Sequence, residues 1–168
     1  MTPVIQVRRA ARALVTDPDG RVLLVRVHDD IPMDAADPVR DYWITVGGGL
    51  ERGESFEDAI VREIREEIGR QVDDPGPCIW QRSKTVTGRD GVVRTVEERY
   101  FWCPLPSPEL DHAGLSPAER TALVEFRWWE LKDPALDAVR VFPETFAAAA
   151  RDIVRNGRPA APRPLPGD

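Results

Sequence analysis

The period of the hydrophobic pattern changes several times along this chain, and each change marks a predicted element. Segments rich in apolar, β-branched and aromatic residues are typical of strands, and they cover residues 4–16, 21–27, 79–87, 92–104 and 121–130. Turn signals separate the first two segments, at Asp17-Pro18-Asp19-Gly20, and the third from the fourth, at Arg89-Asp90-Gly91. The two pairs are therefore predicted to form hairpins.

Two other segments have the period of a helix. The first follows Ser55, a good N-cap, and is stopped by Gly69. Its apolar stripe consists of Phe56, Ile60, Val61, Ile64 and Ile68. The second helix is predicted over residues 142–154, where apolar residues again recur at helical spacing.

The segments between these elements are predicted to be turns and loops. Gly47, Gly48 and Gly49 follow a short strand at Trp43 and are expected to turn tightly before the first helix, because residues without a Cβ reach positive φ without a steric penalty. Residues 28–41 and 105–120 lack periodicity and are predicted to be long loops of the kind that often carries function.

Length and composition indicate one globular unit. The chain has 168 residues, of which 42% are hydrophobic and 31% charged. We expect a single domain over residues 1–156 and, because the end of the chain is rich in proline and has no periodicity, a disordered tail over residues 157–168. No apolar run approaches the roughly 18 residues that would span a bilayer, and the N-terminus has no secretory pattern. A membrane partner is therefore not expected.

Cysteine content and net charge indicate the compartment of the protein and the kind of partner it binds. Cys78 and Cys103 have no metal-binding spacing and are too few for a disulfide framework, which predicts a reduced, cytoplasmic protein. A net charge of −6 argues against nucleic acid as a partner. A small anionic substrate would then need local positive charge, which a bound cation could supply.

The first predicted helix carries an unusual row of acidic side chains. On a helical wheel Glu63, Glu66 and Glu67 form a ridge along one edge of the apolar stripe, and Glu67 falls inside it, so Glu67 is expected to be partly buried. Acidic residues on a helix are most often a solvated face. Here, however, like charges repel at i and i+4 near the helix C-terminus, which costs on the order of 0.3–1 kcal/mol per effect. Carboxylates at this spacing suit a hard divalent cation.

The same residues carry a resemblance to a known family. Gly48, Glu54 and the run Arg62-Glu63-Ile64-Arg65-Glu66-Glu67-Ile68-Gly69 stand at the spacing of the Nudix box, the signature of the Nudix hydrolases. Two positions depart from that signature. Arg70 stands where the box closes with an aliphatic residue, and Val46 stands where a proline often precedes the paired glycines.

The resemblance implies a fold and a reaction. The fold would be α/β (α+β), a Nudix-like α/β/α sandwich with a mixed β-sheet between helices. The reaction would be metal-dependent hydrolysis of a diphosphate linkage in a nucleoside diphosphate joined to another moiety, with Mg²⁺ or Mn²⁺ as cofactor. The implied catalytic residues are Glu63, Glu66, Glu67 and Arg62, and the implied metal-site residues are Glu63, Glu66, Glu67, Glu54 and Gly48.

Several assignments stay open at this stage. Arg8, Arg9 and Arg12 interrupt the first strand, either as an exposed face or as contacts to substrate phosphates, so Arg8 and Arg9 are substrate-binding candidates together with Gly48 and Gly49. A further acid outside the helix often completes the site in this family. The candidates here are Glu97, Glu98, Glu119 and Glu125.

Two other functions are weighed against the hydrolase. A non-catalytic nucleotide sensor of the same fold would be expected to lose ligand glutamates, and none is missing here. An isoprenoid diphosphate isomerase would need a catalytic cysteine in a matching motif, and the sequence offers none. The identity of the small-molecule substrate is not determined by the sequence, and a homodimer is expected only by analogy with the family.

Overall fold

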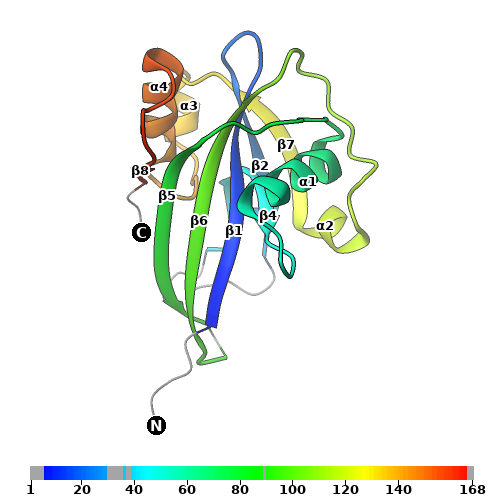
Figure 1. The fold of residues 1–168 in the computed structure, drawn as a ribbon, viewed down its shortest axis with the longest axis vertical. Coiled ribbons are helices and arrows are strands. Elements are labelled where there is room, and N and C mark those ends of the chain that lie inside the picture. The colour runs from blue at the N-terminus through cyan, green and yellow to red at the C-terminus, as the bar shows by residue number, and fades with distance from the viewer. Residues whose placement is uncertain (1–5, 30–35, 37–38, 89, 166–168) are drawn as a thin grey trace.

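The structure is a computed structural model that describes residues 6–29, 36, 39–88 and 90–165. Within that part of the chain eight strands form one mixed sheet in the order β3-β2-β1-β6-β5-β8, while β4 pairs with β1 and β7 pairs with β2 (Figure 1). The strands are β1 (Gln6–Thr16), β2 (Val22–His28), β3 (Asp41–Ile44), β4 (Val46–Gly49), β5 (Cys78–Thr87), β6 (Val93–Pro104), β7 (Leu123–Trp129) and β8 (Arg163–Pro164). The helices are α1 (Phe56–Ile68), α2 (Pro117–Ala122), α3 (Pro134–Asp137) and α4 (Phe146–Asn156).

Helices cover both faces of this sheet, which confirms the predicted sandwich. Successive side chains of a strand point to opposite faces, so the apolar residues of β1 divide between two cores. Leu14 packs with Phe146 and Ile153 of α4, whereas Ala13 and Val15 pack with the apolar stripe of α1. In Figure 1, α1 and α2 lie on one side of the sheet and α3 and α4 on the other.

The central pair of the sheet is β1 with β6, which run parallel along their whole length. The register joins Gln6 to Arg94 at one end and Thr16 to Pro104 at the other. The later half of β1 is buried on both faces, as expected for a strand in the middle of a covered sheet. The first residues of β1 are exposed, so this end of the sheet is open to solvent.

Local signals fix the limits of α1 as predicted. The Ser55 side chain accepts a hydrogen bond from the Asp58 backbone N–H, and Gly69 closes the helix in the left-handed conformation at φ 65°. Ile60, Ile64 and Ile68 are fully buried against the sheet.

The glycine segment differs from the prediction of a turn. Gly47, Gly48 and Gly49 belong to β4, which pairs antiparallel with β1. A Cβ on Gly47 would lie 2.1 Å from the Ala11 carbonyl oxygen, so the glycine permits a backbone contact that a side chain would prevent. The turn instead occupies the connection between β4 and α1.

The regions around the last two predicted elements also differ in detail. Residues 105–120, predicted to be a loop, contain the start of α2, which is nucleated by a capping box between Ser116 and Glu119. The predicted second helix begins at Phe146 instead of Phe142. The segment before it pairs with β3, since the Phe142 N–H donates to the Trp43 carbonyl at 2.8 Å.

The proline-rich end of the chain does not form a free tail up to residue 165. β8 pairs with β5, the Leu165 N–H donates to the Gln81 carbonyl at 2.8 Å, and the Leu165 side chain is only 3% exposed. Parts of several predicted segments lie outside the described residues, namely 1–5, 30–35, 37–38, 89 and 166–168. None of the described helices is both long enough and apolar enough to cross a bilayer.

Candidate active site

The acidic ridge of α1 lies against the glycine strand β4. Glu63 is 6% exposed and Glu67 is 5% exposed, so the partial burial expected for Glu67 is in fact nearly complete. The Gly47 N–H donates to Glu67 Oε2 at 3.1 Å. A Cβ on Gly48 would lie 2.4 Å from Glu63 Oε1, which means that the Gly48 backbone is in direct contact with that carboxylate.

Arg62 holds three of the acidic side chains together. Its Nη1 donates to Glu63 at 2.8 Å and to Glu66 at 3.2 Å. Its Nε and Nη2 donate to the two oxygens of Glu54 at 2.8 and 2.9 Å, and Nη2 also donates to the Gly49 carbonyl at 3.0 Å. Arg62 therefore links the turn after β4 to the middle of the helix by charge-assisted bonds.

Burial and mutual repulsion disfavour the ionised forms of the two buried carboxylates, Glu63 and Glu67. Loss of solvent, followed by repulsion from Glu63, raises the pKa of Glu67 to about 8. Burial also raises the pKa of Glu63, although Arg62 opposes the change. The hydrogen bonds from Arg62 instead hold the pKa of Glu54 below its ordinary value.

The donors of this ridge suit a hard divalent cation. They are carboxylate oxygens beside a close-packed backbone, the ligand type that Mg²⁺ and Mn²⁺ prefer. Buried Glu63 and Glu67 would both gain from added positive charge. In the described part of the chain, however, no group of three or more His, Cys, Asp or Glu side chains is already arranged to hold an ion. Arg62 bridges Glu63 and Glu66 instead.

The four candidate acids outside α1 have different environments in the structure. Glu119 is close enough to raise the pKa of Glu67 through charge repulsion, because α2 lies beside the end of α1. Glu125 pairs with Arg26 at 3.3 Å on β7, and its side chain is 43% exposed. Glu97 and Glu98 point to opposite faces of β6, as the alternation predicts, and each is held by arginine.

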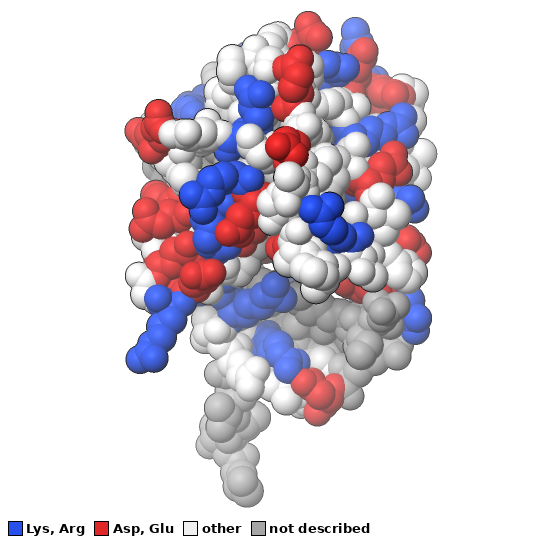
Figure 2. Space-filling model, turned by 90° about the vertical axis from the view of Figure 1, so that its right-hand side faces the viewer, with Lys and Arg blue, Asp and Glu red and all other residues white. Residues whose placement is uncertain are grey.

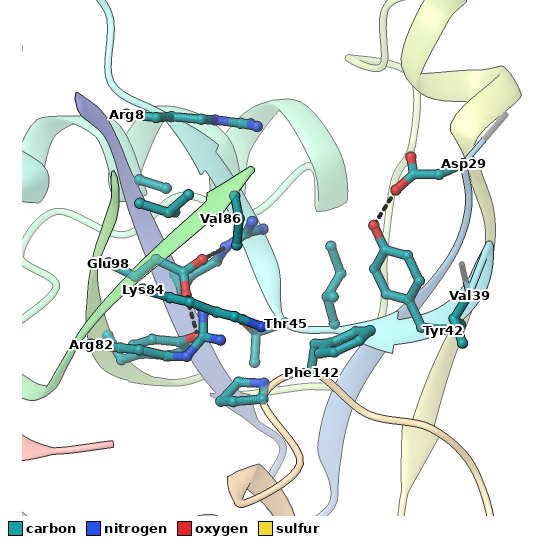
Figure 3. A pocket seen from close by; sticks show the side chains of 16 residues that line it. Arg8, Asp29, Val39, Tyr42, Thr45, Arg82, Lys84, Val86, Glu98 and Phe142 are labelled. Atoms are coloured by element: carbon teal, nitrogen blue, oxygen red, sulfur yellow. Dashed lines mark hydrogen bonds and ion pairs between the residues drawn. The ribbon is translucent and has the colours of Figure 1, made fainter. Parts of the chain in front are cut away.

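A cavity of about 140 Å³ lies on the α4 face of the sheet, on the other side of β1 and β4 from the ridge. Figure 3 shows Arg8, Arg82 and Lys84 on one side of it and Tyr42 with Asp29 on the other. Tyr42 donates a hydrogen bond to Asp29 and packs edge-on against Phe142, at 5.0 Å between ring centroids. One wall is therefore cationic and the other largely aromatic.

A chain of polar contacts joins this cavity to the ridge. Glu98 accepts hydrogen bonds from Arg12 at 3.1 Å and from Arg82 at 2.8 Å. Burial opposes ionisation, but these two guanidinium groups hold the pKa of Glu98 below its ordinary value. Arg12 also donates to the Gly47 carbonyl at 2.8 Å, and the Gly47 N–H donates to Glu67.

The sequence-predicted substrate contacts divide between the two faces. Arg8 lines the cavity, whereas Arg9 pairs with Glu97 at 3.2 Å on the α1 face. Tyr42, Arg82 and Lys84 also line the cavity and were not among the residues predicted from the sequence. A partial signal was present, since Arg82 and Lys84 are two residues apart and so share a face of one strand. The sequence pattern did not show which strands lie on either side of β5.

The surface around the ridge is mixed in charge. Figure 2 views the side of the molecule that carries α1 and α2, where acidic side chains gather around basic ones and neither sign covers the whole face. The net charge of −6 is therefore not evenly distributed over the surface, and four cationic side chains line the cavity on the opposite side of the sheet.

The fold is thus an α/β/α sandwich in which helix α1 buries Glu63 and Glu67 against the glycine strand β4. The profile of the NUDIX domain matches residues 6–153, and the chain belongs to the Nudix family. The resemblance inferred from the box is therefore confirmed.

Curated relatives match part of the chain. The nucleoside triphosphatase NudI of Escherichia fergusonii is 37% identical over 83 residues, which cover 49% of this chain and 55% of that protein. NudI of Escherichia coli O139:H28 is 43% identical over 54 residues, which cover 32% of this chain and 35% of that protein. The chain thus spans about half of their length or less.

Solved structures agree over nearly the whole fold. The MutT protein of Methanosarcina mazei superimposes with a TM-score of 0.65 at 18% identity, covering 92% of this chain and 98% of that one. The E. coli dihydroneopterin triphosphate pyrophosphohydrolase superimposes with a TM-score of 0.57 at 20% identity, covering 91% and 99%. At this identity the likeness establishes the fold alone.

Proposed function

We propose that this protein is a Mg²⁺- or Mn²⁺-dependent hydrolase that cleaves a diphosphate linkage in a small nucleoside diphosphate derivative. The observation that carries the proposal is the burial of Glu63 and Glu67 against β4 without enough fixed positive charge. Such an arrangement destabilises a metal-free protein and suits a divalent cation. Membership of the Nudix family supports the same reaction class.

Each residue of the ridge has a role in this proposal. Glu63, Glu66 and Glu67 would hold the metal, with Glu54 and the Gly48 backbone beside them. A bound divalent ion would neutralise diphosphate oxygens during attack by water. Arg62 orients the Glu54 and Glu63 carboxylates through its hydrogen bonds. Glu119, or a glutamate of the ridge, would accept the proton of the attacking water.

The substrate would extend from the ridge past β4 toward the cavity. Arg8 lines the cavity and Gly48 and Gly49 border the ridge, so these substrate-binding candidates are compatible with one extended ligand. Arg9 faces the α1 side, where its pairing with Glu97 leaves its role as a contact a prediction. The names of the curated relatives make nucleoside triphosphates the first substrates to test.

The test is a metal-dependent screen followed by one substitution. Nucleoside triphosphates, sugar nucleotides, dinucleoside polyphosphates and ADP-ribose would be assayed with Mg²⁺, Mn²⁺ and EDTA. On the best substrate, Glu67→Gln should lower kcat by about 10²–10³, the usual cost of losing one group that stabilises transition-state charge. Arg65→Gln is the matched control, because Arg65 is exposed on the same helix. Near-parental turnover of both variants would contradict the ridge as the catalytic centre.

Three further expectations remain predictions. They are a cytoplasmic location, the lack of a nucleic-acid partner, and a homodimer. Sedimentation at tens of micromolar decides the last of these, since a monomer at that concentration would exclude a stable dimer.

A further inference from the structure

The cationic wall of the cavity is built in two layers on neighbouring strands. In the inner layer Glu98 of β6 lies between Arg82 of β5 and Arg12 of β1 and bonds to both. In the outer layer the register places Arg8 of β1 and Lys84 of β5 opposite the same residue of β6, Val96. Two cations therefore flank an apolar residue at the position where the inner layer has a carboxylate.

The geometry of a sheet brings the outer cations within reach of one ligand. Arg8 and Lys84 lie two strands apart, about 10 Å between backbones, and both side chains rise from the same face. Figure 3 shows both extending into the cavity. Long Arg and Lys side chains on this spacing can hold one anionic group between them, as Arg12 and Arg82 hold Glu98.

Cationic side chains outnumber carboxylates among the described residues that line the cavity. Four cations, Arg8, Arg12, Arg82 and Lys84, face two carboxylates, Asp29 and Glu98. Glu98 is already engaged by two arginines, and Asp29 accepts the Tyr42 hydroxyl. The side chain of Arg8 forms no hydrogen bond or ion pair with any described residue, and only its backbone pairs with β6. A concentration of positive charge in a protein of net charge −6 is an attractive site for an anion.

The opposite wall suits a ring. Tyr42 and Phe142 present aromatic surface, and Val86 and Val96 add apolar surface beside the cations. A ligand that fits both walls has a planar or sugar ring with a negatively charged substituent.

We propose that the cavity recognises a second anionic group of the substrate, a phosphate or carboxylate on the ring-bearing moiety, separate from the diphosphate that is cleaved. The outer cations Arg8 and Lys84 would make this contact and so set specificity. This inference rests on the proposed hydrolase function for its place in a reaction, but the binding site can be tested without turnover.

The binding test uses metal-free protein. Calorimetry in EDTA would compare adenosine 2′,5′-bisphosphate with AMP, which differ by one phosphate. The parent should bind the bisphosphate at least tenfold more tightly, and Arg8→Gln and Lys84→Gln should each remove about tenfold of that preference, the scale of one hydrogen bond to a charged group. Arg94→Gln is the control, because Arg94 pairs with Asp90 on β6 outside the cavity. The same calorimetry with UDP-glucuronate and UDP-glucose tests a carboxylate, and equal binding within both pairs, or binding of none of the four compounds, overturns the proposal.

The kinetic test uses substrate pairs that differ in one anionic group. NADP with NAD tests a phosphate, and UDP-glucuronate with UDP-glucose tests a carboxylate. The charged member of one pair should have the higher kcat/KM, and both cavity variants should reduce the kcat/KM of the charged member by more than that of the uncharged member. If the variants slow both members equally, the cations contact the cleaved diphosphate and the proposal is wrong. If no diphosphate is hydrolysed with either metal, the hydrolase function fails, whereas the metal-free binding result still decides the cavity.

Discussion

At the scale of single residues, Glu67 has the environment that is hardest to explain by stability alone. It is 5% exposed and lies beside a second buried carboxylate, and among the described residues its side chain accepts a hydrogen bond from one backbone N–H, that of Gly47. Removing a carboxylate from water without a full counter-charge is costly, and proteins usually avoid it. Residues that break such rules are commonly found at functional sites.

This environment predicts an unusual pH dependence for the metal-free protein. Burial and Glu63 raise the pKa of Glu67 to about 8 in the folded state from an ordinary value of 4.5. The folded state therefore binds this proton more tightly than the unfolded state, so the contribution of Glu67 to stability is full below about pH 4.5 and is lost as the pH rises through 8.

Urea unfolding in EDTA between pH 5 and pH 8 measures this effect. The free energy of unfolding of the parent should fall more steeply with rising pH than that of Glu67→Gln, and the variant should be the more stable of the two at pH 8. Parallel curves for the two proteins would show that Glu67 titrates normally in the folded chain.

At the scale of elements, the segment after β6 is fastened to the end of α1. The Asp111 N–H donates to the Ile68 carbonyl at 3.0 Å, and His112 Nδ1 donates to the Glu67 carbonyl at 2.6 Å. A Cβ on Gly114 would lie 2.6 Å from the Glu66 carbonyl oxygen, which shows how closely the two segments pack. These contacts bring α2, and Glu119 with it, toward the ridge.

We predict that Glu119 is the outside acid and that Glu125 is not. Glu119→Gln should lower kcat by about 100-fold or more, the lower range for loss of general acid–base catalysis. The helix should persist, because Gln can replace Glu in a capping box. Glu125→Gln should stay within about twofold of the parent. The measurement is kcat at saturating Mg²⁺ with melting temperatures as a check on folding, and two unaffected variants would return the role to the ridge.

The elements also show which parts of the structure the sequence could predict. The limits of α1 and the row of glutamates were predictable because Ser55, Gly69 and the spacing of the apolar residues are local signals. The capping box at Ser116 and Glu119 was present in the sequence but was not used. The cavity was not predictable, since it depends on β1 pairing parallel with β6, which places Arg8 and Lys84 on either side of Val96.

At the scale of the whole molecule, the end of the chain completes the core on the α4 face. Leu165 joins a cluster that includes Trp80, Phe146 and Ile153. The segment is fixed by its backbone bond to Gln81 and by Arg158, whose Nη2 donates to the Trp102 carbonyl at 2.7 Å. A proline-rich composition could not reveal this, because the partners lie far away in the sequence.

Leu165→Ala tests the packing of this segment. The substitution should lower the free energy of unfolding by about 2 kcal/mol or more, the usual cost of truncating a buried leucine. Arg163→Gln is the control, since its ion pair with Asp152 is more than half exposed on the arginine side and should contribute little. Urea unfolding measures both. Equal, small effects would mean that the last residues do not contribute to the core.

Binding of a divalent ion at the ridge should stabilise the whole folded chain. A ligand that binds only the folded state stabilises it, by about 2.7 kcal/mol at a concentration 100 times its Kd. Millimolar Mg²⁺ or Mn²⁺ should therefore raise the melting temperature by roughly 5–10 °C for a chain of this size. Glu67→Gln should remove most of that rise, although it relieves repulsion in the metal-free protein. Glu57→Gln, an exposed acid in the first turn of the same helix, should keep it. If the parent and both variants melt at temperatures that do not depend on the metal, the ridge does not bind a divalent ion in the folded protein.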